Sequence, residues 1–542
     1  MTASRRREGR RLPTLLVVAG CFAVAAAFAI VGGANAPGSG ARPGIAVAAA
    51  LPTVAEPDAV STSWYCAEGT GAPGGRADET VLITNQGADD ARAVVTVMGG
   101  GQNDRESRGV DVEPGMQVRV PVSSVVQAVE QPNETGIVGP GVIVEVFGGR
   151  SVVEHEIEGE GETAVGPCAR RAGRDWYFAA GTTERGAEQN AALFNPFPDD
   201  AIVDLTFATD AGFIAPADLQ AVVVPRHTRL TVPIGNFLRR QAQVALHVHA
   251  RTGRVVAEQS LVFTPENETR RGLTLSLGAP APESSWTLPG LTPGDGVSHT
   301  VLVANFDPSA TEVEITPRFE DQPNTRPQPL PVGGRSVAVF DPMTFGGSGA
   351  SFGVEVQTTR PSSVVVEELA WWAPPAAGTG SATALASPVG VPAWTFTVGP
   401  PAPEAEATIS VVNPGHSRGS VTLEAYDPGG GPAPRRVDAL TLPGGEAGAV
   451  RPRRSGSRTR SGPRHARRRP RGRGSSHPRP VRRVTGPRRR EPVTAPDVPA
   501  LDAHLFHPWR PPRWLRRTRL PGWRRTPVDS RTWSSASCSR SR

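Results

Sequence analysis

Two histidines form the strongest metal-binding pattern in the sequence. His247 and His249 lie two residues apart in residues 244–249, where apolar and polar side chains alternate as in a strand. Residues i and i+2 of a strand face the same side, so both imidazoles could bind one metal ion. No third residue has a spacing from this pair that identifies it as a metal ligand. The sequence therefore favours an exposed pair of strand histidines, and it predicts neither a metal nor a cofactor.

Three glutamates recur at the ends of valine-rich runs, at Glu154, Glu258 and Glu367. A carboxylate at one fixed position could bind a ligand in each copy. The simpler interpretation is a strand-end glutamate that is hydrogen-bonded to backbone N–H groups or to an arginine. We expect the simpler role.

Catalytic motifs are absent from the sequence. It lacks Gly-x-Ser-x-Gly, a P-loop, His-Glu-x-x-His and a dinucleotide-binding fingerprint. Residues 154–156 read Glu-His-Glu, but strand alternation places His155 on the opposite face from both carboxylates. We therefore predict no catalytic residue and a protein that is not an enzyme.

These residues lie in a pattern that recurs four times. A tryptophan opens each copy, and an asparagine that ends an apolar run follows it by 21, 19, 19 and 19 residues. The tryptophans are Trp64, Trp176, Trp286 and Trp394, and the asparagines are Asn85, Asn195, Asn305 and Asn413. Each tryptophan is predicted to fill a domain core, with sugar stacking as the alternative, and each asparagine to support a turn.

The copies contain short β-branched runs separated by Gly and Pro turns. In the first copy, residues 81–84 and 94–97 are predicted strands, and Pro114-Gly115 is the predicted turn of a hairpin over 112–120. About 110 residues with several such strands is typical of one β-sandwich. We predict an all-β chain of tandem immunoglobulin-like β-sandwich repeats of about 110 residues, after one N-terminal transmembrane helix and before a disordered basic C-terminal tail.

The predicted organisation has six parts. They are residues 1–50 with cytoplasmic arginines, signal anchor and linker; repeats at 51–170, 171–280 and 281–389; an incomplete repeat at 390–450; and an Arg/Pro-rich tail at 451–542.

The N-terminus predicts the location. Five arginines between positions 5 and 11 precede residues 12–31, which are uncharged and long enough for one helical pass through a bilayer. We expect an uncleaved signal anchor, and the small residues at 34–36 leave a cleaved signal peptide as the alternative. Both place the repeats outside the cytoplasm. With an uncleaved anchor, the protein would be a single-pass protein of the cell membrane with an extracytoplasmic repeat region.

Charge is strongly segregated along the chain. Residues 451–542 carry a net charge of +23, whereas residues 51–450 carry −22, so the overall +6 describes neither part. The tail begins inside the fourth copy, which favours a change of reading frame after about Val450. A functional basic tail and an unrelated fused segment are the alternatives. We expect no nucleic-acid partner.

The four cysteines are Cys21, Cys66, Cys168 and Cys538. Cys66 and Cys168 bracket the first repeat, and in an oxidising compartment they are a disulfide candidate. Such a bond would close a loop of about 100 residues and add roughly 4 kcal/mol of stability.

Several of these motifs together resemble a known family. The Trp-Tyr-Cys opening at 64–66, the asparagine turns and the Val-Val-x-Glu closings resemble an actinobacterial family of membrane-anchored, extracytoplasmic, β-rich proteins of unknown function (a DUF family). The resemblance covers about residues 51–450, and it implies a location rather than an activity.

The sequence thus predicts a non-enzymatic cell-envelope protein that presents tandem β-sandwiches as a scaffold or binding surface for an envelope protein or glycan. The alternatives are an envelope enzyme with its site at an inter-domain cleft, and a carbohydrate-binding module that uses exposed tryptophans.

Overall fold

The computed structural model is an all-β protein. It describes residues 60–450, with gaps at 72–76, 100–104, 127–129, 149, 160–161, 321–324, 346–350, 377, 389, 392, 396–407 and 426–434, and also residues 502–506. The helices of this part of the chain are four short 3-10 turns, Val122–Ser124, Ala217–Leu219, Ile234–Asn236 and Pro342–Phe345. None of the described residues belongs to a helix that could span a membrane. The predicted anchor at 12–31 lies outside the described residues.

Unit 1 is a sandwich of two four-stranded sheets. The sheets are ordered β1-β8-β3-β4 and β10-β9-β2-β5. The strand bounds are β1 Ser61–Cys66, β2 Asp78–Asn85, β3 Ala91–Met98, β4 Arg105–Val112, β5 Gln117–Pro121, β6 Gln131–Pro132, β7 Ile137–Gly139, β8 Gly141–Phe147, β9 Ser151–Gly159 and β10 Glu162–Pro167.

Unit 2 has corresponding sheets. One contains β11-β17-β13 with β14 and β15 paired to β13, and the other runs β19-β18-β12-β16 and continues into β7 and β6 of the preceding segment. The bounds are β11 Asp175–Phe178, β12 Ala187–Asn195, β13 Ala201–Thr209, β14 Gly212–Ile214, β15 Val222–Val224, β16 Thr228–Pro233, β17 Val244–Thr252, β18 Val256–Phe263 and β19 Gly272–Leu277.

Unit 3 is built from the sheets β20-β25-β22-β23 and β27-β26-β21-β24. The bounds are β20 Ser285–Leu291, β21 Val297–Asn305, β22 Thr311–Arg318, β23 Gln328–Val332, β24 Ser336–Phe340, β25 Phe352–Thr358, β26 Val365–Trp372 and β27 Gly380–Leu385. A single bridge, Thr209 to Ser336, links its β24 to β13 of unit 2.

Unit 4 has a pair of strands, β29-β30, and a three-stranded sheet, β31-β28-β32. The bounds are β28 Thr408–Val412, β29 Gly419–Ala425, β30 Arg435–Leu442, β31 Ala447–Val450 and β32 Asp502–Phe506. Strand β32 lies within the Arg/Pro-rich tail, which the sequence predicts to be disordered or out of frame, and it pairs with β28 in the place that β9, β18 and β26 take beside their neighbours. His504 stands at the register position that a glutamate holds in the other units.

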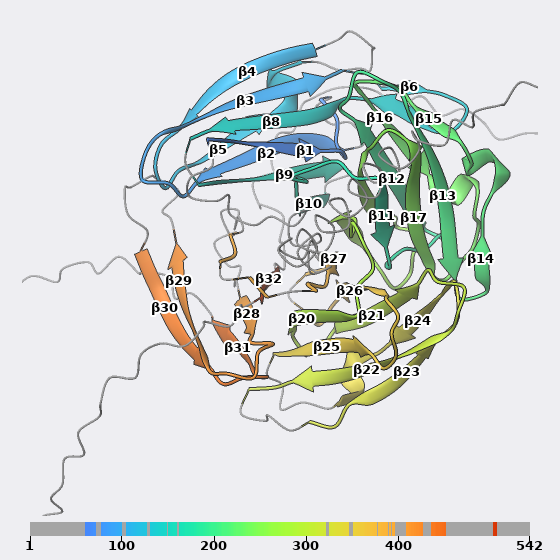
Figure 1. Ribbon diagram of the computed structural model, residues 1–542, viewed down its shortest axis with the longest axis vertical. Coiled ribbons are helices and arrows are strands. Elements are labelled where there is room, and N and C mark those ends of the chain that lie inside the picture. Colours follow the sequence, from blue (N-terminus) through green and yellow to red (C-terminus); the bar gives the residue numbers. More distant parts are fainter. Residues whose placement is uncertain are drawn as a thin grey trace, which may run out of the picture.

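The units follow one another around a ring, with unit 1 in blue, unit 2 in green, unit 3 in yellow-green and unit 4 in orange (Figure 1). In units 1 to 3, the sheets that end in β10, β19 and β27 lie inward, and β19 packs against both β10 and β27. The other sheets, which contain β3, β13 and β22, lie outward. We call these the inner and outer sheets.

Burial differs most clearly between the outer sheets, which have a solvent face, and the inner sheet of unit 2, which is covered on both sides. In the outer strands β13 and β22, buried residues alternate with more exposed ones. In the inner sheet of unit 2, β12 is buried from Gln189 to Asn195, and every residue of β19 is buried. An inner sheet covered on both sides explains the near-continuous apolar runs of the sequence.

The predicted hairpin over 112–120 is wrong. A turn is present, with Gly115 at φ 73°, but β4 pairs with β3 in one sheet and β5 pairs with β2 in the other. The turn therefore carries the chain from one layer of the sandwich to the other. The corresponding turn residues His227, Arg335 and Gly445 also have positive φ.

The repeated tryptophans and asparagines have structural positions. Trp64, Trp176 and Trp286 are buried in the sandwiches, and Trp394 is half-buried. All four asparagines are fully buried, and each side-chain amide donates to a carbonyl four residues later and to the layer-crossing segment. Those carbonyls belong to Asp89 and Val112, Asp199 and Val224, Ser309 and Gly333, and Ser417 and Leu442. The asparagine thus joins a local turn to the connection between layers.

Candidate functional site

The recurring glutamates connect neighbouring units. Glu258 of unit 2 accepts a 2.7 Å hydrogen bond from the backbone N–H of Glu68 in unit 1. Glu367 of unit 3 accepts bonds of 2.8 and 2.6 Å from the N–H groups of Ala179 and Ala180 in unit 2. In both places the carboxylate reaches the segment just after the preceding unit's tryptophan strand. We call this contact the glutamate clamp.

Glu154 occupies the same register as the clamp residues. It pairs with Leu82 on β2, as Glu258 pairs with Ala192 and Glu367 with Leu302. It is also buried. The three positions that the sequence singled out are therefore equivalent in the sheet.

A buried polar pair lies next to each glutamate. The residue after the glutamate meets the residue six positions before the repeated asparagine: His155 with Glu79, Gln259 with Gln189, and Glu368 with His299. The ring nitrogen and carboxylate are 3.1 Å apart in unit 1 and 2.5 Å apart in unit 3, and the two amides of unit 2 are 2.7 Å apart. The pair thus has the same position in the three units, but it consists of a histidine and a glutamate in units 1 and 3 and of two glutamines in unit 2.

The first interface, between units 1 and 2, is charged. His155 Nε2 lies 3.2 Å from Glu258, and Arg229 bonds Glu68 at 3.3 Å and Glu130 at 2.5 Å. His155, Arg229, Glu68 and Glu258 are all at most 1% exposed. With Glu79 beside His155, four acidic and two basic side chains are thus brought together from segments far apart in the sequence.

Burial and neighbouring charges act in opposite directions on His155. Burial alone would lower its pKa, but Glu258 and Glu79 flank the ring and raise the pKa to about 10. The pKa of the Glu79 carboxyl is raised by burial, even though His155 opposes that shift. His155 therefore lies between two buried carboxylates, 3.1 Å from Glu79 and 3.2 Å from Glu258.

The second interface, between units 2 and 3, relies on backbone dipoles. Burial raises the pKa of Glu367 to about 7, and the two alanine N–H groups offset only part of that increase. The side-chain amide of Gln259 donates to the carbonyl of Ala180, and the N–H of Ala180 donates to Glu367. Both backbone groups of Ala180 are therefore hydrogen-bonded.

These carboxylates are close together but closed to substrate. An envelope enzyme at an inter-domain cleft would need such groups in contact with solvent, whereas Glu68, Glu79 and Glu258 are at most 1% exposed. Their burial, and their bonds to the neighbouring unit, favour a structural role.

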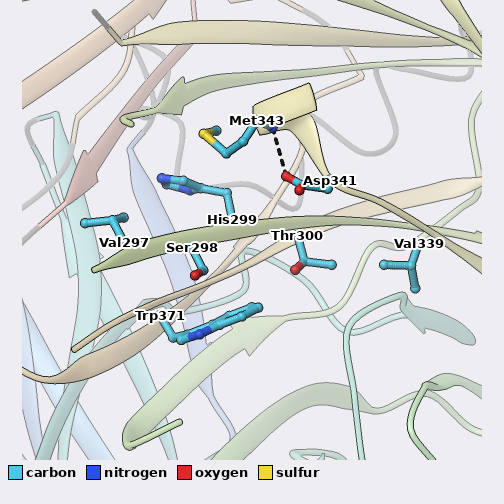
Figure 2. Close-up of a pocket in the computed structure, with 8 residues that line it drawn as sticks. All are labelled: Val297, Ser298, His299, Thr300, Val339, Asp341, Met343 and Trp371. Atoms are coloured by element: carbon cyan, nitrogen blue, oxygen red, sulfur yellow. Dashed lines mark hydrogen bonds between the residues drawn. The ribbon is translucent and has the colours of Figure 1, made fainter. Parts of the chain in front are cut away.

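An open recess of about 240 Å³ lies on unit 3. Figure 2 shows its lining: Val297, Ser298, His299, Thr300, Val339, Asp341, Met343 and Trp371. Trp371 is half-buried, and the guanidinium of Arg270 lies 4.7 Å from its ring centre. The recess combines an aromatic face with hydroxyl and carboxylate groups.

His299 is fixed in the wall of this recess. Its Nδ1 lies 2.5 Å from Glu368, and its Nε2 lies 2.9 Å from the carbonyl of Thr292. Burial would lower the pKa of His299, but the Glu368 carboxylate overcomes this and raises it. With both nitrogens engaged, the His299 ring is held in one orientation.

The two histidines of the metal-binding pattern lie on the outer sheet of unit 2. His247 and His249 meet Asp175 of the neighbouring strand β11, at 3.0 and 2.7 Å from the same oxygen, Oδ1. Hydrogen bonding from His247, and then from His249, lowers the pKa of Asp175. Sequence reasoning missed Asp175 because only strand pairing brings it there, although it directly precedes the repeated Trp176.

The cysteine pair also has a defined place. Cys66 and Cys168 form a disulfide that joins the start and end of unit 1, and both are buried. Their sulfurs lie near His155, but a disulfide has no thiolate to offer a metal. This group is therefore not a metal site.

Comparison with known proteins gives one match. No curated protein and no solved structure is detectably similar to the chain. A family of unknown function, DUF5719, matches residues 151–341, which run from the start of β9 through unit 2 into unit 3. The matched part contains Glu154, Glu258 and all of the Asp175–His247–His249 group. Over these residues the chain is therefore similar to DUF5719, a family whose function is unknown.

Proposed function

We propose that this is a non-enzymatic cell-envelope protein that presents tandem β-sandwiches as one rigid binding platform. Its units are copies of one immunoglobulin-like domain. Residues 12–31 anchor it in the membrane, and the sandwiches stand outside the cytoplasm. The platform receives an envelope protein or a glycan.

The glutamate clamp is the observation that carries this proposal. The buried carboxyl groups of Glu258 and Glu367 accept hydrogen bonds from backbone groups of the preceding unit, 190 and up to 188 residues away in the chain. Hydrogen bonds to charged groups contribute about 1.5–3 kcal/mol each. Such contacts favour a fixed arrangement of units over beads on a flexible chain.

The apolar cores support the same conclusion. The core of unit 3 continues into Ala179, Ala180 and Phe263 of unit 2, and the core of unit 2 includes Ala67 and Met98 of unit 1. Cores that are continuous across units resist relative motion of the domains.

The disulfide supports the location. Structural disulfides persist in oxidising compartments and are rare in the cytosol. Cys66–Cys168 is buried and ties both ends of unit 1 together.

A pull-down from solubilised envelope tests the platform. The full chain is immobilised beside the E258A/E367A variant, in which the clamp carboxylates are removed and the apolar core residues are unchanged. We expect a partner that the wild type retains and the variant loses. Turnover of a substrate by the purified chain, with no protein or glycan captured, would exclude the proposal.

The recess on unit 3 favours glycan as a second candidate ligand. The half-buried indole of Trp371 lines this recess together with Ser298, Thr300 and Asp341, so stacking and hydrogen-bonding groups are both present. The repeated tryptophans are poorly suited to this role, because three of them are buried. Titration with cell-wall glycan fragments should quench tryptophan fluorescence in the wild type but not in W371L, and equal quenching in both would contradict the assignment.

A further inference from the structure

We propose that Asp175, His247 and His249 form a binding site for a divalent first-row metal ion on the outer face of unit 2. Their ligand atoms all lie within 4.8 Å of one another. Two imidazoles and one carboxylate are a ligand set that Zn²⁺ and Fe²⁺ use in proteins.

The backbone brings these three side chains to one face. Strand β11 pairs with β17 so that Asp175 lies opposite His249 and Tyr177 lies opposite His247. The intervening Trp176 and Val248 point into the core, where both are buried. By alternation, Asp175, His247 and His249 share the outward face. A hydrogen-bonded sheet therefore holds the ligands before any metal binds.

The distances suit a small ion. Ligand bonds of about 2.0–2.1 Å in a tetrahedron place the donor atoms about 3.3 Å apart. The Asp175 oxygen lies 3.0 Å from His247 Nε2 and 2.7 Å from His249 Nδ1. An outward shift of the Asp175 oxygen by a few tenths of an ångström would bring these two distances to that value, and the two imidazole nitrogens lie within 4.8 Å of each other.

Neighbouring groups orient the site and leave it accessible. The ring of Tyr177 stacks on His247 at 4.2 Å with an 8° interplanar angle, and Phe306 of unit 3 meets His247 edge-on. The side chains of His247, Asp175 and His249 are 22, 34 and 46% exposed. Three protein ligands leave a fourth position, which is open to water or to a side chain of a bound partner.

The same geometry would also result from two protonated histidines that share one carboxylate, so the test must separate these cases. Zn²⁺ is titrated into the full-length wild-type chain at pH 7.5 against a chromophoric chelator. We expect one site per chain that is lost from H249Q and from D175N. Loss of an outer-shell partner alone costs roughly 10–100-fold in affinity, so loss of a direct ligand should cost at least that.

H227Q is the matched control, because His227 lies in a turn of the same unit and outside the group. It should bind Zn²⁺ as the wild type does, and thermal unfolding should show all variants folded. Co²⁺ gives a second readout: the wild type should show d–d absorption that H249Q lacks. The proposal is overturned if the wild type binds no Zn²⁺, or if H249Q and D175N bind it with unchanged affinity.

Discussion

The two interfaces place the same carboxylate in different surroundings. At the first interface, Glu258 accepts one N–H and lies beside the His155 ring, with Arg229 and Glu68 close by. At the second interface, Glu367 accepts two N–H groups, and the polar pair that unit 2 brings to this interface is Gln189–Gln259, which carries no charge. One architectural contact is thus stabilised by charges in one place and by peptide dipoles in the other.

This difference separates geometry from electrostatics. The clamp requires only an acceptor at one register position, and both interfaces provide it. The surrounding groups decide how the acceptor responds to protons, because a buried carboxylate without a cation binds a proton more readily. The interfaces should therefore differ less in shape than in their sensitivity to mutation and pH.

Arg229→Met should produce the largest effect. Arg229 is fully buried between Glu68 and Glu130, and its removal deletes the guanidinium that pairs with both carboxylates. Breaking a buried ion pair by removing one partner costs about 3–5 kcal/mol. Guanidinium denaturation should show this loss in the free energy of unfolding of units 1 and 2.

Arg251→Met is the control for that substitution. Arg251 pairs with Asp204 on the outer sheet, and its side chain is 49% exposed. Exposed pairs contribute about 0–1 kcal/mol. If both substitutions cost the same, the first interface is not a buried charge cluster.

The second interface should become more stable as the pH falls towards 5. Burial raises the pKa of Glu367 to about 7 from the ordinary value of 4.5. Between these values the folded state binds more protons than the unfolded state, so stability increases as the pH falls through this window. The change is on the order of 3 kcal/mol. The free energy of unfolding, measured from pH 4.5 to 8, should change with pH in the wild type by this amount more than in E367Q. The same pH dependence in both proteins would contradict the prediction.

The first interface should respond at alkaline pH instead. Glu258 and Glu79 overcome the effect of burial and raise the pKa of His155 to about 10, above the ordinary 6.5. Stabilisation by its charge is therefore complete below 6.5 and is lost as the pH rises towards 10. In a plot of the free energy of unfolding against pH, H155Q should remove the loss of stability between pH 6.5 and 10. The change between pH 4.5 and 7 that Glu367 causes should stay as in the wild type.

Glu367→Ala should have a smaller and local effect. The variant leaves the N–H groups of Ala179 and Ala180 without their acceptor, which costs about 1–3 kcal/mol. Hydrogen exchange at residues 179–180 should accelerate, while exchange at Glu68 of the first interface stays as in the wild type. Faster exchange at both interfaces would mean that the clamps are not independent.

Local chemistry made part of this fold predictable. The repeated asparagines and tryptophans could be found by spacing, because turn hydrogen bonds and core filling depend on residue type at fixed positions. The layer-crossing turn was mistaken for a hairpin because Pro114-Gly115 specifies a reversal of direction, whereas the sheet joined by each flanking strand is decided by tertiary packing.

The clamp and the metal ligands were hidden for a different reason. Glu258 was predicted to bond backbone N–H groups, but its partner, Glu68, belongs to another unit. Asp175 meets His247 only through the pairing of β11 with β17. The polar pairs could have been found, since their members stand six residues before each asparagine and one after each glutamate.

The smallest expected effect concerns the polar pair behind the second interface. Replacing both amides, as Q189M/Q259M, removes their mutual hydrogen bond and the bonds from Gln259 to Ala180 and from Gln189 to Val244. Substituting both partners by apolar side chains of similar length is often nearly neutral, so we expect a loss of about 1 kcal/mol. The equivalent E79M/H155M variant should cost more, because Glu258 then lies buried without its cation. Denaturation of both variants tests this ranking, and equal losses would mean that the charge of the pair has no role in holding unit 1 to unit 2.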